Sequence, residues 1–176
     1  VLLKGINTWE AKSIQDAYEI VSTPLEYEES YEILEQTMTF EDENTTNASN
    51  FIDVSLLLQF ISGTDNYGYK NTFYVLKDKN DSYELYFVPW DTDLSLGVTW
   101  GYDYKESVNE IIERYELPTM KRKVDALDAK FAKRWKELRQ GIYSEENVLG
   151  VCKELTEQLL NSGAIERDEE QWGLLH

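Results

Sequence analysis

Two short loops carry the residues of this chain whose types and spacing are best suited to chemistry. Asp65 and Asn71 precede a segment with the pattern of a β-hairpin, and Asp91 and Asp93 follow it directly. Because a hairpin returns the chain to its starting point, we expect these four side chains to approach one another around one cavity. Carboxylate and amide oxygens suit Mg²⁺ or Mn²⁺, and a carboxylate without an adjacent cation can act as a general base.

The same residues also have purely structural interpretations. Asp65 can form an Asx-turn, and Asp91 can cap the short segment that follows it. An Asp-x-Asp pair also occurs easily by chance in a chain with 34 acidic residues. A calcium loop of the EF-hand type does not fit, because Gly97 comes one place late and Tyr102 stands where a glutamate is needed. On spacing alone, both the metal-site and the structural interpretation stay open.

Hydrophobic periodicity predicts the elements that must position these loops. Alternating aromatic and β-branched residues predict one hairpin, while spacings of three and four predict helices around it. We therefore expect a single α+β domain over residues 1–176 that is predominantly helical, with one small β-hairpin. The first two expected helices span about 8–21 and 27–39, and a third is capped by Asp53 and ended by Gly63. A fourth has an apolar stripe over 124–138, and a fifth spans Glu145–Leu160 with Val148, Val151, Leu155 and Leu159 inward. The expected strands are Thr72–Lys77 and Ser82–Val88.

Charge and composition exclude several classes of function. The chain has 34 Asp and Glu against 17 Lys and Arg, a net charge of −17, and no Lys or Arg from Ser13 to Tyr69. Because phosphate backbones are bound by Lys and Arg, we expect no nucleic-acid partner. No apolar run is long enough for membrane insertion, and no signal peptide is visible. With one cysteine, Cys152, and a single histidine, His176, multi-cysteine zinc sites and histidine-based triads are excluded.

Three groups of residues carry a family resemblance. They are Phe51–Leu57, then Gly63, Asp65, Asn66, Asn71 and Tyr74, then Pro89, Trp90, Asp91, Asp93, Leu94 and Gly97, with Arg134, Trp135, Arg167 and Asp168 in the tail. On these residues the chain resembles the spore coat protein H (CotH) kinase-like family, from about residue 10 to residue 173. The resemblance implies a fold like the C-terminal lobe of a protein kinase.

The resemblance also implies a role for each site residue. Asp65 would match the catalytic aspartate that accepts the proton of the acceptor hydroxyl. Asn71 would match the metal-binding asparagine, although it lies six residues after Asp65 where typical kinases have five. Asp91 would match the metal-binding aspartate and Asp93 would be a second ligand or an orienting neighbour, and which of the two touches metal stays open. Trp90 would line the nucleotide pocket, unless it is a core residue.

The activity implied is that of an atypical protein kinase that uses Mg²⁺ or Mn²⁺ to transfer phosphate from ATP to Ser or Thr of a protein. The family implies a bacterial protein of the spore coat or cell surface, with coat or surface proteins as candidate partners. Kinases also hold ATP with a glycine-rich loop and a strand lysine. Lys4 and Lys12 are the only cations before Asp65, and neither has the sequence context of a strand next to a glycine turn. We therefore expect a C-lobe-like fragment that is inactive by itself.

Two functions of other classes remain open. The first is a non-catalytic surface or spore-coat assembly module that keeps a kinase-like fold for binding. The second is a calcium-stabilised adhesion domain of a larger surface protein.

Overall fold

The structure is a computed structural model that describes residues 1–6, 12–38, 46–63, 65–66, 71–79, 82–96, 98 and 118–173. The chain divides into two compact units, Val1–Phe131 and Ala132–His176. The first unit contains all five predicted site residues, Asp65, Asn71, Trp90, Asp91 and Asp93. That the chain forms a single domain over 1–176 stays a prediction.

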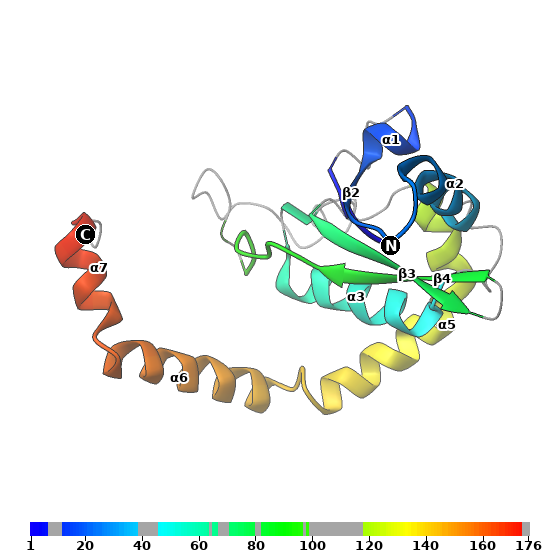
Figure 1. The fold of residues 1–176 in the computed structure, drawn as a ribbon. Coiled ribbons are helices and arrows are strands. Elements are labelled where there is room, and N and C mark those ends of the chain that lie inside the picture. The colour runs from blue at the N-terminus through cyan, green and yellow to red at the C-terminus, as the bar shows by residue number, and fades with distance from the viewer. Residues whose placement is uncertain are drawn as a thin grey trace. The chain divides into compact units, whose positions relative to one another are not determined.

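The first unit is built on a four-stranded antiparallel sheet with the strand order β2-β1-β3-β4 (Figure 1). Its strands are β1 (Leu2–Gly5), β2 (Tyr18–Ser22), β3 (Thr72–Lys79) and β4 (Ser82–Pro89). The predicted hairpin is confirmed as β3–β4, with Thr72 opposite Pro89 at its open end. The expectation of one hairpin alone is wrong, because β1 and β2 extend the sheet. The α+β class is confirmed.

The predicted helix over 8–21 is wrong in its second half. Helix α1 covers only Ile14–Ala17, and the chain then continues as β2. Tyr18 and Ile20 are buried while Glu19 between them is exposed, which is the period of a strand. Apolar residues at positions 14, 17 and 20 also fit a helical spacing, so the local pattern was ambiguous. Pairing with β1, which is distant in sequence, decides in favour of the strand.

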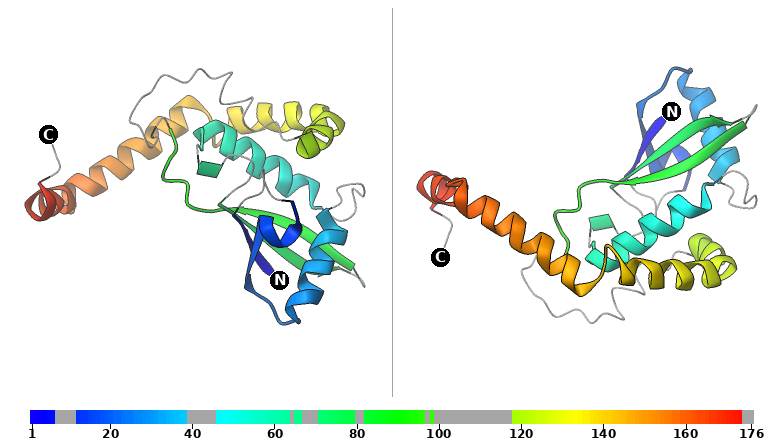
Figure 2. Two further views of the ribbon diagram at one scale, coloured as in Figure 1. Left: turned by 90° about the horizontal axis from the view of Figure 1, so that it is seen from above. Right: turned by 90° about the horizontal axis from the view of Figure 1, so that it is seen from below.

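Two helices of this unit lie against the sheet. Helix α2 (Tyr27–Met38) agrees closely with its predicted range, and α3 (Ala48–Ile61) packs beside β4 (Figure 1, Figure 2). Helix α3 begins earlier than predicted, because the side chain of Asn47 accepts a hydrogen bond from the Asn50 amide at 2.9 Å. Asn47 is therefore the N-cap, and Asp53 lies inside the helix. The largest fully buried apolar residues form the core between sheet and helices: Leu3, Leu34, Phe51, Leu58, Tyr74, Leu85 and Phe87.

A side-chain amide fastens α3 to the edge strand β4. Asn50 donates from Nδ2 to the Phe87 carbonyl at 3.1 Å, and its Oδ1 accepts from the Phe87 amide at 2.7 Å. The amide thus supplies the same donor and acceptor pair as a neighbouring strand would. Just before α3, the Asn47 amide donates to the Leu85 carbonyl at 3.0 Å. These contacts cover an edge that would otherwise present unpaired backbone groups.

The second unit consists of helices. Helix α5 (Pro118–Gln140) runs across the boundary of the units, followed by α6 (Glu145–Asn161) and α7 (Ala164–Trp172). The prediction that α6 turns its apolar stripe inward is wrong for this unit. Val151, Leu155 and Leu159 are 47%, 54% and 53% exposed. Helical periodicity places these residues on one face, but it cannot supply a partner for that face.

Within the residues described, we find no helix that is long and apolar enough to cross a lipid bilayer.

Candidate active site

The end of α3 determines the position of Asp65. The helix stops at Ser62, which adopts a left-handed backbone with φ of +52°, and the Gly63 amide bonds back to the Leu58 carbonyl at 3.1 Å. This closure turns the chain sharply out of the helix, as left-handed helix ends commonly do. Asp65 follows two residues later and is partly buried. Its Oδ2 accepts a 2.5 Å hydrogen bond from Nδ2 of Asn71.

Asn71 joins three parts of the fold. Its backbone amide donates to the Gly5 carbonyl at the end of β1 at 3.0 Å, and its carbonyl accepts from the Trp90 amide at 3.1 Å. Its side chain, in a residue only 8% exposed, reaches Asp65. The chain before the hairpin and the chain after it are therefore in direct contact, as the hairpin geometry predicts.

Asn71 and Asp91 both have left-handed backbones, with φ of +50° and +55°. Residues other than glycine rarely adopt this conformation, although Asn and Asp tolerate it best. Backbone strain of this kind persists only where surrounding contacts impose it, and it is concentrated at functional sites. That two of the five predicted site residues carry it supports a functional interpretation of these loops.

The donor set is suited to a divalent metal that also binds a ligand. Asp91 and Asp93 are both exposed, on the segment that leaves the contact between Trp90 and Asn71. Among the described residues, no group of three or more Asp, Glu, His or Cys side chains could hold a metal ion by itself. Mg²⁺ in proteins commonly takes one or two carboxylates and fills its remaining positions with water and substrate phosphates. One or two aspartates with the Asn71 amide oxygen fit that arrangement, whereas a closed protein cage does not.

Trp90 lies on the sheet surface rather than in the core. It is 51% exposed, and its ring centroid is 5.0 Å from that of Phe73. Phe73 pairs across the hairpin with Val88, which is 43% exposed. The outer face of the sheet next to Asp91 therefore carries accessible aromatic and apolar surface.

Sequence reasoning missed three residues beside the site. Asn66 is fully buried and bonds to both loops. Phe73 supports Trp90. Lys4 lies on β1 directly before Gly5 and pairs with Phe73 across the strands, so both side chains are on one face of the sheet. The expectation that Lys4 has no strand context is wrong, since Lys4 lies on β1, and Gly5 is the last residue of that strand. The segment Leu2-Leu3-Lys4 has no alternation of apolar and polar residues, so the local sequence did not predict the strand.

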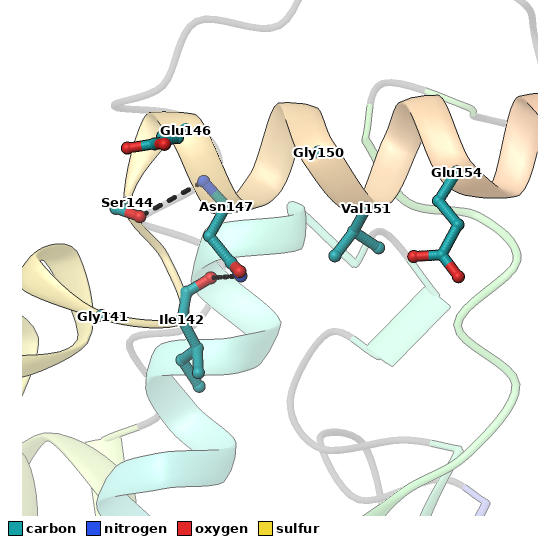
Figure 3. Close-up of a pocket in the computed structure, with 8 residues that line it drawn as sticks. All are labelled: Gly141, Ile142, Ser144, Glu146, Asn147, Gly150, Val151 and Glu154. Atoms are coloured by element: carbon teal, nitrogen blue, oxygen red, sulfur yellow. Dashed lines mark hydrogen bonds between the residues drawn. The ribbon is translucent and has the colours of Figure 1, made fainter.

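A separate hollow of about 800 Å³ lies in the second unit, around the start of α6 (Figure 3). Its polar groups are largely used locally. The hydroxyl of Ser144 accepts from the Asn147 amide at 3.3 Å, and Nδ2 of Asn147 donates to the Ile142 carbonyl at 2.8 Å. Gly150 and Val151 complete an apolar floor. None of the predicted site residues lines this hollow.

Comparison with known proteins identifies the family. No curated protein and no solved structure matches the chain, so its likeness to a protein-kinase lobe stays a prediction. The family model described as CotH kinase protein matches residues 12–176, which include both loops, all of the second unit and the first unit from residue 12 onward. The resemblance expected from Asp65, Asn71 and the Trp90–Asp93 segment is thereby confirmed. The chain belongs to the CotH kinase protein family.

Proposed function

We propose that the protein is a metal-dependent atypical protein kinase that transfers the γ-phosphoryl group of ATP to Ser or Thr of a protein. The observation that carries the proposal is the direct bond between Asp65 and Asn71, held against the chain that leads into Asp91. Membership of the CotH kinase family supports a kinase-like protein that uses nucleotide and metal.

Asp65 would be the catalytic residue that receives the proton of the attacking hydroxyl. The hydroxyl oxygen forms a bond to the γ-phosphorus, the bond from that phosphorus to the β,γ-bridging oxygen breaks, and ADP leaves. The hydrogen bond from Asn71 holds the Asp65 carboxylate in one orientation, which keeps the acceptor in line.

Asn71 and Asp91 would hold Mg²⁺ or Mn²⁺, with Asp93 as a second ligand or an orienting neighbour. When bound, the metal supplies positive charge that neutralises the phosphates in the transition state. The side-chain nitrogen of Asn71 donates a hydrogen bond to Asp65. The side-chain oxygen of Asn71, Oδ1, is therefore the atom that would bind the cation. Asp91 and Asp93 are exposed and can reach a shared ligand.

Trp90 would form the platform for the adenine ring, with Phe73 packed against it at an interplanar angle of 57°. The indole of a half-exposed tryptophan offers a flat apolar face, and stacking of a base on such a face is worth about 1–3 kcal/mol. Lys4, on the same face as Phe73, would add positive charge near the phosphates. The family name suggests association with the spore coat, so coat or surface proteins are the proposed substrates.

Isosteric substitutions test the proposal. In the intact protein, Asp65→Asn and Asp91→Asn should each lower phosphoryl transfer from labelled ATP by about 10²-fold or more, because each removes a charge but little volume. Asp128→Asn, on the exposed surface of α5, is the matched control and should transfer normally. Circular dichroism would verify that all three variants fold. Normal transfer by either site variant would refute the assignment.

Binding measurements separate the kinase from its rivals. A kinase should show a calorimetric signal with Mn²⁺ and ATP together. If there is none, the non-catalytic assembly module is the better interpretation. A rise in melting temperature that requires Ca²⁺ and ignores ATP would instead indicate a calcium-stabilised adhesion domain.

A further inference from the structure

Asn66 connects the two halves of the site through one amide group. The residue is fully buried, and its Nδ2 donates to the Asn71 carbonyl at 3.1 Å and to the Trp90 carbonyl at 2.8 Å. Only the NH₂ end of an amide can face two carbonyl oxygens, so its orientation is determined by these partners. Asn66 therefore bridges the loop before the hairpin and the loop after it.

The bridge acts on the peptide that leads into Asp91. The Trp90 carbonyl accepts from Asn66, and the Trp90 amide donates to Asn71. Because the backbone amide and the backbone carbonyl of Trp90 are both hydrogen-bonded, the plane of the peptide between Trp90 and Asp91 cannot turn freely. The φ angle of Asp91, at +55°, is the rotation that follows this plane and directs the Asp91 side chain.

This arrangement includes features that destabilise the folded chain. Within the part of the chain that the structure describes, Oδ1 of the buried Asn66 has no hydrogen-bond partner. A buried polar atom without a partner is destabilising, and such atoms are uncommon in folded proteins. Asn71 and Asp91 add two left-handed backbones in the same place. Asn66 therefore satisfies two carbonyls with its NH₂ group and leaves its own oxygen unpaired, as expected of a residue whose position is determined by those two carbonyls.

We propose that Asn66 is a positioning residue that sets the direction of the Asp91 side chain by clamping the Trp90–Asp91 peptide to Asn71. Its role in metal and nucleotide binding rests on the proposed kinase function. The clamp itself is a property of the chain without ligand. It can therefore be tested separately.

Amide hydrogen exchange measures the clamp directly. In the wild-type chain the Trp90 amide should exchange slowly, because it is bonded to Asn71. In Asn66→Ala, the exchange rate of Trp90 divided by that of the core amide Leu58 should rise about tenfold, the factor that corresponds to losing one well-formed hydrogen bond. Asn66→Asp, which replaces the donor with an oxygen, should have the same effect.

Asn50→Ala is the matched control. Asn50 also joins the chain to β4 through two amide bonds, but at Phe87, away from Asp91. The Asn50→Ala substitution should raise the exchange rates of the Trp90 and Leu58 amides together and leave their ratio unchanged. An unchanged ratio in the Asn66 variants would overturn the proposal. Unprotected exchange of Trp90 in the wild type would also overturn it, even if no Asn66 variant folds.

The affinity of the intact protein for Mn²⁺ with ATP then tests whether the clamp contributes to ligand binding. Asn66→Ala should weaken it about tenfold, and Asn50→Ala should change it less than about twofold. If the wild type binds and Asn66→Ala binds equally well, the positioning role is refuted. If the wild type does not bind, the proposed kinase function fails, and hydrogen exchange still decides whether the clamp exists.

Discussion

Replacing Asn50 with alanine should release α3 from the edge of the sheet. The amide of Asn50 makes two hydrogen bonds to the backbone of Phe87, of 3.1 and 2.7 Å. Phe87 is 1% exposed, so water cannot easily replace the lost partner. The substitution is therefore expected to weaken the attachment of α3 to β4 at Phe87 and to lower the stability of the folded chain as a whole.

The loss of stability can be worked from these two bonds. Each contributes about 1 kcal/mol net, and leaving buried backbone groups without this partner adds about 1 kcal/mol or more. The better helix propensity of alanine returns about 0.5 kcal/mol. We expect the free energy of unfolding to fall by about 2–3 kcal/mol, which for a chain of this size lowers the melting temperature by about 5–10 °C.

Urea unfolding monitored by circular dichroism would measure this loss. Asn161→Ala is the control, since Asn161 is exposed near the end of α6, and its stability should change by less than about 0.5 kcal/mol. A loss below about 1 kcal/mol for Asn50→Ala would refute the view that its amide substitutes for a neighbouring strand.

Three further outcomes follow from the structure. Trp90→Ala should weaken ATP binding about tenfold by calorimetry, while Trp172→Ala, in the exposed end of α7, should not. Mn²⁺ should bind weakly alone and more tightly with ATP, and Asp91→Asn should abolish that synergy; tight binding of metal alone would contradict a site completed by phosphates. Burial raises the pKa of the Tyr18 phenol above the usual value of about 10, and a hydrogen bond with Tyr74 lowers it to a smaller extent. Above about pH 10 the unfolded chain loses the phenol proton of Tyr18 while the folded chain keeps it. The contribution of Tyr18 to stability is therefore complete below about pH 10 and is lost as the pH rises above it. In Tyr18→Phe, the melting temperature should fall less steeply with rising pH in this alkaline range.

Local sequence pattern was sufficient for several elements. Helix α2 and the β3–β4 hairpin agree with their predicted ranges, because each is determined by a period of three to four or of two within about ten residues. The candidate site was also predicted from the residue types at Asp65, Asn71 and Asp91, and its loops are in contact because a hairpin joins them. The family followed from the same residues.

Other features could not be read from local pattern. β2 shares its apolar spacing with a helix, and only pairing with β1 selects the strand. The stripe on α6 was predicted to be inward, yet Leu155 and Leu159 are exposed, because a period places residues on a face without providing what covers it.

By itself, the sequence determined the family and the hairpin, whose open end brings Asn71 next to Trp90, and it led to the prediction of Asp65, Asn71 and Asp91 as site residues. Only the tertiary structure decided that Asn66 bridges two carbonyls and that Asn71 and Asp91 are held in left-handed backbones. The physical reason is the range of the interactions. Residue type and period act over a few neighbours, whereas the clamp joins groups up to 24 residues apart, whose contact depends on the folded positions of both loops.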